Sequence, residues 1–186
     1  DEEALSSPLT TIQKRLPWLL GNIVLYVGAA SAIAPFQSTI ALVPVLAVIM
    51  PILSNTSGNV GIQALSVTVR GLGVGEVTPE DTLAILRKEV LAGLGTALAL
   101  GMALAILSLI WSSAINRWVA LVAGLVMAVN VLVAASLGTL LPMGLKRLKL
   151  DPALISGPLL TTILDTVGFL TFLSLISVFL RFFQAH

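Results

Sequence analysis

Five long apolar runs, separated by short polar or charged stretches, dominate the chain. Three of them have about 20 residues, the length at which an α-helix crosses the hydrocarbon core of a bilayer. The first run is barely long enough, and the second is too long and contains polar residues and helix breakers. The pattern predicts an all-α membrane protein with five spans, the second of them an irregular or broken helix. The runs are Trp18 to Phe36, Thr39 to about Val69, Val90 to Trp111, Trp118 to Leu141 and Leu159 to Leu180.

The third span carries a helix-start signal in the polar stretch before it. Thr78 is a suitable N-cap, Pro79 suits the first helical position, and Asp81 falls in the first turn. This helix is therefore expected to begin in water and to enter the membrane after Glu89.

Small residues recur along the third span at Gly93, Ala97 and Gly101, and again at Gly95, Ala99 and Ala103. This spacing places the residues of each set on one helix face, where they allow a neighbouring helix to approach closely in lipid. The pattern predicts helix packing and says little about function.

Composition supports the membrane class and excludes several functions. Hydrophobic residues make up 57% of the 186 residues and charged residues only 10%, which a soluble fold could not accommodate. The net charge of +1 argues against nucleic acid as a partner. Without cysteine, and with His186 at the very end as the one histidine, thiolate and imidazole chemistry are not expected. No nucleophile and base pair is evident, so we do not expect an enzyme.

The distribution of positive charge predicts the orientation. Eight of the ten Lys and Arg residues lie in the N-terminal flank and in the second and fourth loops. By the positive-inside rule these segments are cytoplasmic, and the C-terminus lies outside. The acidic N-terminal stretch does not resemble a signal peptide, and a soluble portion is expected to precede it in the cytosol.

Asp165 is the one acidic residue inside a predicted span. It follows Pro158 by seven residues, which places it on the order of 10 Å inside the fifth span. An ionised carboxylate at that depth costs on the order of a few kcal/mol unless it is paired or hydrated. No Lys or Arg lies within any predicted span. Asp165 is therefore either protonated and hydrogen-bonded in the bundle, or ionised and facing water and a cation.

The neighbours of Asp165 favour the wet environment. Thr161 and Thr162 lie one turn before it and Gly168 one turn after, so that one helix face carries hydroxyls, a carboxylate and bare backbone. In the second span, the stretch PILSNTSGNVGIQ (residues 51–63) supplies amides, hydroxyls and a kinked backbone. Such backbone is tolerated at membrane depth only against protein or a water-filled cavity. The two segments are expected to line one aqueous path.

The available ligands predict the ion. They are carboxylate, amide, hydroxyl and backbone oxygens, which suit Mg²⁺, an ion that keeps several of its own waters. One carboxylate per chain leaves a divalent ion half neutralised. Two copies of Asp165 on a twofold axis would match its charge, so we expect a homodimer with the pore at or near the axis.

At these residues the chain resembles the MgtE family of magnesium channels. The stretch at residues 51–63 is similar to the family's proline followed by Gly-Asn-x-Gly-x-Gln, and LDPALISGPLLTTILDTVG (residues 150–168) is similar to its fifth-span segment. The resemblance implies a homodimeric five-helix pore domain over residues 17–186, in the cytoplasmic membrane of a bacterium or archaeon. It also implies that residues 1–16 are the end of a connecting plug helix and linker, after cytosolic magnesium-sensing domains.

The same resemblance assigns roles to individual residues. It implies that Asp165 selects the ion, with Mg²⁺ as the bound metal. Glu89 is a weaker candidate at the cytoplasmic mouth, where a solvated interface pair with Lys88 is the simpler explanation. The residues expected along the ion pathway are Gly58, Asn59, Gly61, Gln63, Gly157, Thr161, Thr162 and Gly168.

These features are compatible with three functions to different degrees. The favoured one is passive, magnesium-selective conduction of largely hydrated ions, gated by the cytosolic portion. The alternative is a secondary transporter that couples divalent cation movement to protons or Na⁺, since broken helices and a buried protonatable carboxyl also fit that class. No inverted repeat is evident in five spans. A purely structural membrane anchor would have no need of Asp165.

Overall fold

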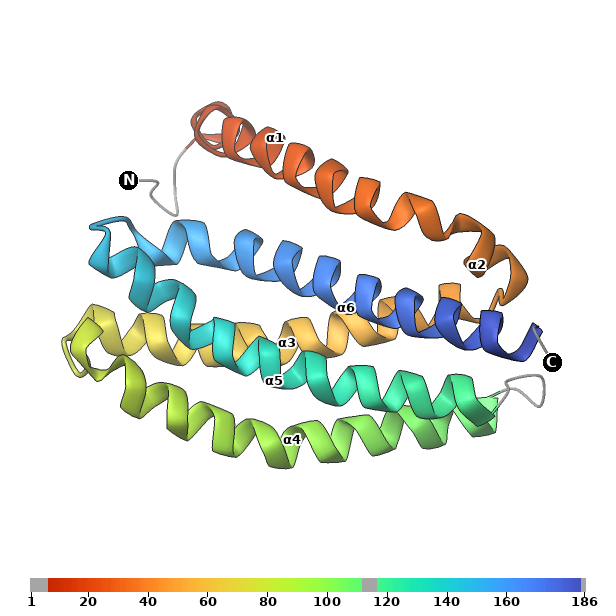
Figure 1. Cartoon of the computed structure of the whole chain (residues 1–186). Coiled ribbons are helices and arrows are strands. Elements are labelled where there is room, and N and C mark those ends of the chain that lie inside the picture. Colours follow the sequence, from red (N-terminus) through yellow and green to blue (C-terminus); the bar gives the residue numbers. More distant parts are fainter. Residues whose placement is uncertain (1–6, 112–116, 185–186) are drawn as a thin grey trace.

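The computed structural model describes residues 7–111 and 117–184 of the chain (Figure 1). These residues form helices and short connections, and no strand occurs among them. The predicted all-α class is therefore confirmed. His186 and the first six residues of the predicted connection over 1–16 lie outside the described residues.

Five long helices follow one another along the chain, with three short helical segments between them. The long helices are α1 (Pro8–Ile33), α3 (Leu46–Val74), α4 (Thr82–Trp111), α5 (Arg117–Arg147) and α6 (Pro152–Gln184). The short segments are the 3-10 helix η1 (Ala34–Phe36), α2 (Gln37–Leu42) and the 3-10 helix η2 (Pro79–Asp81).

Four segments of the described chain are long and apolar enough to cross a membrane. Helix α3 has 29 residues and carries the polar stretch at 51–63, and it is not among the four. The chain is therefore a multi-pass membrane protein. The four segments are Pro8–Leu42, Pro79–Ile110, Arg117–Arg147 and Gly157–Arg181.

The polar stretch at 51–63 is regular helix throughout. Helix α3 continues from Leu46 to Val74 across Pro51 and both glycines, and the interruption of the second span lies upstream, at residues 43–45 between α2 and α3. The structure therefore places no break in the helix within residues 51–63, where one was predicted. Each glycine in a helix costs about 1 kcal/mol relative to alanine. Gly61 permits close packing against Leu160 and Leu164 of α6 and Ala134 of α5, whereas a Cβ on Gly58 would meet no other described helix within 4 Å.

Helix α5 is the centre of the bundle (Figure 1). It packs against α3, α4 and α6, and α3 also packs against α6. The core between them is formed by apolar side chains such as Leu53 of α3, Met127 of α5 and Phe172 of α6. Helix α1 rests mainly on α6 and has no buried residue along its described length. It lies on the opposite side of the bundle from α4.

Close backbone contacts hold α4 and α5 together. A Cβ placed on Gly101 of α4 would lie 2.7 Å from the carbonyl oxygen of Gly124 on α5. A Cβ placed on Gly93 would lie 3.3 Å from Cβ of Ala135 on α5. Ala97 is buried on the same face of α4. The set Gly93, Ala97 and Gly101 therefore packs as predicted, whereas Gly95, Ala99 and Ala103 are exposed, because they lie on another face of α4.

The start of α4 is stabilised by a capping box. The backbone N–H of Thr78 donates to Oδ2 of Asp81 over 2.8 Å, and the Thr78 hydroxyl donates to the same oxygen over 2.9 Å. Helix α4 follows directly from this turn, as predicted. At the same end of the bundle, Arg147 of α5 donates to the carbonyl of Pro79 over 2.6 Å, which fixes the loop to the central helix.

Candidate ion site around Asp165

Asp165 lies at the contact between α3 and α6, where it is half-buried. The hydroxyl of Ser54 on α3 donates a short hydrogen bond to its Oδ1 atom. This bond joins the polar stretch of the second span directly to the carboxylate of the fifth. The other carboxylate oxygen, Oδ2, has no hydrogen-bond donor among the described residues.

The threonines before Asp165 present oxygen lone pairs. The hydroxyl of Thr162 donates to the carbonyl of Pro158 over 2.8 Å, and that of Thr161 donates to the same carbonyl over 3.1 Å. Because each hydroxyl proton is directed at the backbone, the oxygen remains free to accept. One face of α6 thus carries two acceptor hydroxyls and a carboxylate, all suited to the hydrogen atoms of water held by a cation.

A cleft between α1, α3 and α6 reaches this face. It has a volume of about 520 Å³. The hydroxyl of Tyr26 on α1 lies 3.3 Å from that of Thr161 and links the two helices across it. Two predicted pathway residues, Gly157 and Thr161, therefore line one space. The full lining is Leu19, Asn22, Ile23, Tyr26, Ile62, Gly157, Pro158 and Thr161.

Open space also adjoins Ser54. Gly58 lies one turn further along the same face of α3. A Cβ placed on it would meet no atom of another described residue within 4 Å. The next residue, Asn59, is exposed. The glycine thus leaves room directly beside the Ser54 and Asp165 pair.

Two further predicted pathway glycines lie at tight helix contacts instead. A Cβ on Gly61 would lie 3.1 Å from the side chains of Leu160 and Leu164. A Cβ on Gly168 would lie 2.6 Å from the amide nitrogen of Asn130. Within one chain, both glycines allow α3, α5 and α6 to pack closely around the site.

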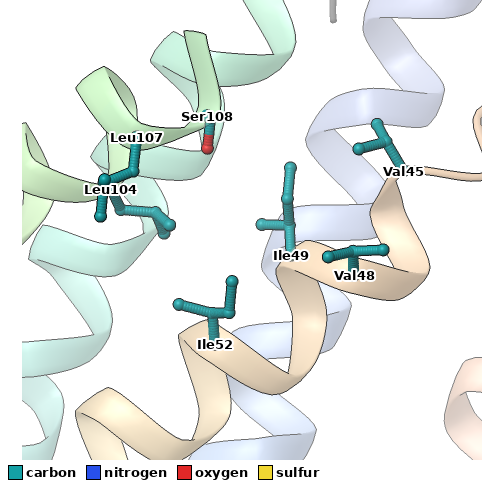
Figure 2. Close-up of a pocket in the computed structure, with 7 residues that line it drawn as sticks. All are labelled: Val45, Val48, Ile49, Ile52, Leu104, Leu107 and Ser108. Atoms are coloured by element: carbon teal, nitrogen blue, oxygen red, sulfur yellow. The ribbon is translucent and has the colours of Figure 1, made fainter. Parts of the chain in front are cut away.

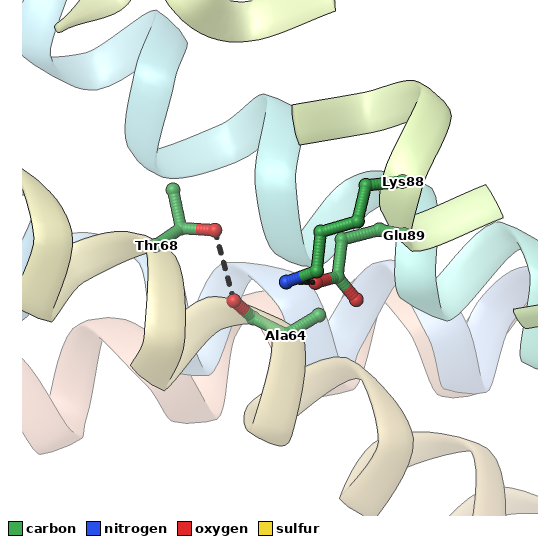
Figure 3. A network of polar contacts seen from close by, with 4 residues as sticks. All are labelled: Ala64, Thr68, Lys88 and Glu89. Atoms are coloured by element: carbon green, nitrogen blue, oxygen red, sulfur yellow. Dashed lines mark hydrogen bonds and ion pairs between the residues drawn. The ribbon is translucent and has the colours of Figure 1, made fainter. Parts of the chain in front are cut away.

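Gln63 and Glu89 lie together in a different place, a groove of about 220 Å³ between α3 and α4. Glu89 pairs with Lys88 over 3.0 Å at this groove, next to Ala64 and Thr68 of α3 (Figure 3). The structure therefore places Gln63 and Glu89 in one groove, which Asp165 does not line.

Farther along the same two helices, a smaller pocket of about 90 Å³ is lined almost entirely by apolar side chains (Figure 2). It carries no group that would bind an ion, and the hydroxyl of Ser108 is its one polar side chain. The lining is Val45, Val48, Ile49, Ile52, Leu104, Leu107 and Ser108.

One buried polar side chain next to the site was not predicted from the sequence. Asn130 of α5 is 2% exposed and donates through Nδ2 to the hydroxyl of Ser57 over 2.8 Å. A lone amide in the otherwise apolar run of the fourth span is the signal that could have indicated it. Tyr26 and Ser54 were also not singled out, because their partners lie far away in the sequence.

Each chain contributes one carboxyl group to the site, that of Asp165. Among the described residues, no three His, Cys, Asp or Glu side chains come together in a way that could hold a metal. A divalent cation next to Asp165 would therefore have to keep much of its water or meet ligands from a second copy of the chain.

Comparison with known proteins identifies the family. Residues 50–175 match the MgtE family model, described as a divalent cation transporter. The chain is 34% identical over 182 residues to a magnesium transporter MgtE of Enterococcus faecalis, an alignment that covers 98% of the chain and 40% of that protein. It is 31% identical over 170 residues to one of Bacillus subtilis, covering 90% of the chain and 37% of that protein.

A third relative, a magnesium transporter MgtE of Thermus thermophilus, is 30% identical over 179 residues, which cover 95% of the chain and 38% of that protein. The chain thus spans about two-fifths of the length of the curated relatives it matches. The matched family segment includes the polar stretch of α3 and the carboxylate of α6. On this match, the chain belongs to the MgtE family of divalent cation transporters.

Proposed function

We propose that this chain forms a magnesium-selective channel pore that passes largely hydrated Mg²⁺ across the cell membrane. The observation that carries the proposal is the half-buried carboxylate of Asp165, held by Ser54 between two membrane helices and flanked by open space at Gly58. A carboxylate at this depth is costly, and such groups mark ion pathways by default.

In the proposed mechanism, the ion is held mainly through its own waters. Mg²⁺ sheds water reluctantly, and its bound waters donate hydrogen bonds to nearby oxygens. Oδ2 of Asp165 and the hydroxyl oxygens of Thr161 and Thr162 are suitable acceptors on one face of α6. Such contacts hold the ion loosely enough to release it, as conduction requires.

The proposal includes a homodimer. Two copies of Asp165 near a twofold axis would balance the charge of one divalent ion, and twofold symmetry is the commonest closed assembly. It also includes gating by a cytosolic magnesium sensor, as the resemblance to the family implies. A cytoplasmic N-terminus, as the distribution of Lys and Arg predicts, would put that sensor on the required side.

The test is the Mg²⁺-to-K⁺ permeability ratio of Asp165→Asn in a planar bilayer. This change keeps the side-chain volume and one oxygen but removes two charges per dimer, so Mg²⁺ should lose its advantage over K⁺ while the protein still assembles. Asp165→Glu keeps the charge and should alter the ratio less. A wild-type ratio in the Asn variant would contradict the role of Asp165.

The same recordings distinguish a channel from a carrier. A channel gives a current that rises with the Mg²⁺ gradient and is unaffected by an imposed gradient of protons or Na⁺. A flux that requires either gradient, and saturates at a low turnover, would instead identify a secondary transporter.

A further inference from the structure

We propose that Asn130 is a positioning residue for the ion site, acting from the central helix through Ser57 and Gly168 on the Ser54 and Asp165 pair. The proposal rests on the proposed function, because it concerns how the same carboxylate is held. Asn130 does not contact Asp165, and its role is to fix the two helix turns on which the site is built.

The first of these turns belongs to α3. Nδ2 of Asn130 donates to the hydroxyl of Ser57 over 2.8 Å. Because Ser57 accepts this bond, its own proton is directed at the carbonyls of Leu53, over 2.8 Å, and Ser54, over 3.2 Å. The Asn130 amide of α5 therefore fixes the turn of α3 that carries the Ser54 hydroxyl.

The second turn belongs to α6. Gly168 lies one turn after Asp165, and a Cβ at this position would come within 2.6 Å of Nδ2 and 3.1 Å of Cγ of Asn130. The absence of a side chain lets α6 rest directly on the amide. One buried side chain therefore sets the separation of α3 and α6 at the level where Ser54 meets Asp165.

The unpaired oxygen of Asn130 argues against a role in stability alone. Its Oδ1 atom is buried and has no hydrogen-bond partner among the described residues. An unsatisfied buried carbonyl oxygen lowers stability, and an apolar side chain would avoid that cost. The half-satisfied amide therefore stabilises the bundle less than a fully bonded one would. Both of its contacts, with Ser57 and at Gly168, instead act on the helix turns that carry Ser54 and Asp165.

The experiment compares the Mg²⁺-to-K⁺ permeability ratios of single and double variants. Size-exclusion chromatography first establishes that each variant assembles like the wild type. Asn130→Ala and Ser57→Ala remove the two ends of one hydrogen bond. Each should lower the ratio by about two- to tenfold, the range that one buried hydrogen bond accounts for. The double variant should lose no more than Asn130→Ala alone, because Ser57 acts on the site only through its bond to Asn130.

Two controls separate this role from general packing and from the proposed function. Thr139 of α5 is also fully buried with an unpartnered hydroxyl, so Thr139→Val removes a comparable polar group and should leave the ratio unchanged. Asp165→Asn in the same assay tests the proposed function itself.

The permeability ratios of these variants test the positioning role of Asn130 and the proposed function separately. A wild-type ratio in Asn130→Ala and Ser57→Ala, together with a collapsed ratio in Asp165→Asn, would overturn the positioning role and leave the proposed function intact. Additive losses in the double variant, or an equal loss in Thr139→Val, would also overturn it. A wild-type ratio in Asp165→Asn would remove the proposed function. If Asn130→Ala does not assemble, Ser57→Ala alone decides, since a small helix-favouring replacement there preserves the fold.

Discussion

Replacing Gly138 with alanine should force α3 and α5 apart. A Cβ at this position would lie 2.6 Å from the carbonyl oxygen of Gly61, 2.8 Å from Cβ of Ala64 and 3.0 Å from the backbone nitrogen of Leu65. Two of these atoms belong to the backbone, so no side-chain rotation relieves the clash. Ordinary contact requires a local separation greater by roughly 0.8 Å. Such overpacking typically costs about 1–3 kcal/mol.

Thermal unfolding in detergent, followed by circular dichroism, measures this cost. Gly95→Ala is the matched control, because its Cβ would meet no atom of another described residue within 4 Å. The control gains helix propensity and should unfold at the wild-type temperature or above. Gly138→Ala should unfold several degrees lower. An equal midpoint for the two variants would refute the close contact between α3 and α5.

Two further predictions concern ion flux. Gly58→Leu should abolish Mg²⁺ flux into liposomes while preserving insertion and helix content, because its side chain would fill the space beside Ser54; unchanged flux would mean that this space is not on the ion path. Glu89→Gln should lower single-channel conductance by less than about twofold at low salt and not at all at high salt, since Glu89 already pairs with Lys88 and charge effects at the interface are screened. A loss that persists at high salt would place Glu89 on the pathway itself.

Local signals in the sequence were sufficient for most of the helical architecture. The start of α4 was predictable because the capping box around Thr78 and Asp81 involves residues only three apart. The face of α4 that packs against α5 was predictable from the spacing of Gly93, Ala97 and Gly101. Helix α3 was harder to predict, because Gly58 and Gly61 argue locally against a helix, and the packing of Gly61 against α5 and α6 depends on residues far away in the sequence.

The site was predictable in its elements but not in its contacts. The depth of Asp165 in its span follows from counting residues, whereas its bond to Ser54 joins positions 111 residues apart. Gln63 shows the reverse case. It lies nine residues after Ser54, which at 3.6 residues per turn places it half a turn away. Once α3 is taken as continuous, helical geometry alone separates Gln63 from the carboxylate.

The polar face of α3 has a consequence for biosynthesis. Two of its hydroxyls have a bond partner on a helix that is synthesised later: Ser57 accepts from a residue 73 positions downstream, and Ser54 donates to one 111 positions downstream. While the ribosome is still making α4, the Ser57 hydroxyl can already donate to carbonyls of its own helix, whereas lipid offers neither serine the partner on α5 or α6. A nascent chain that stops before α5 therefore lacks both of these interhelical bonds, and the polar face of α3 acquires them only as α5 and α6 are added.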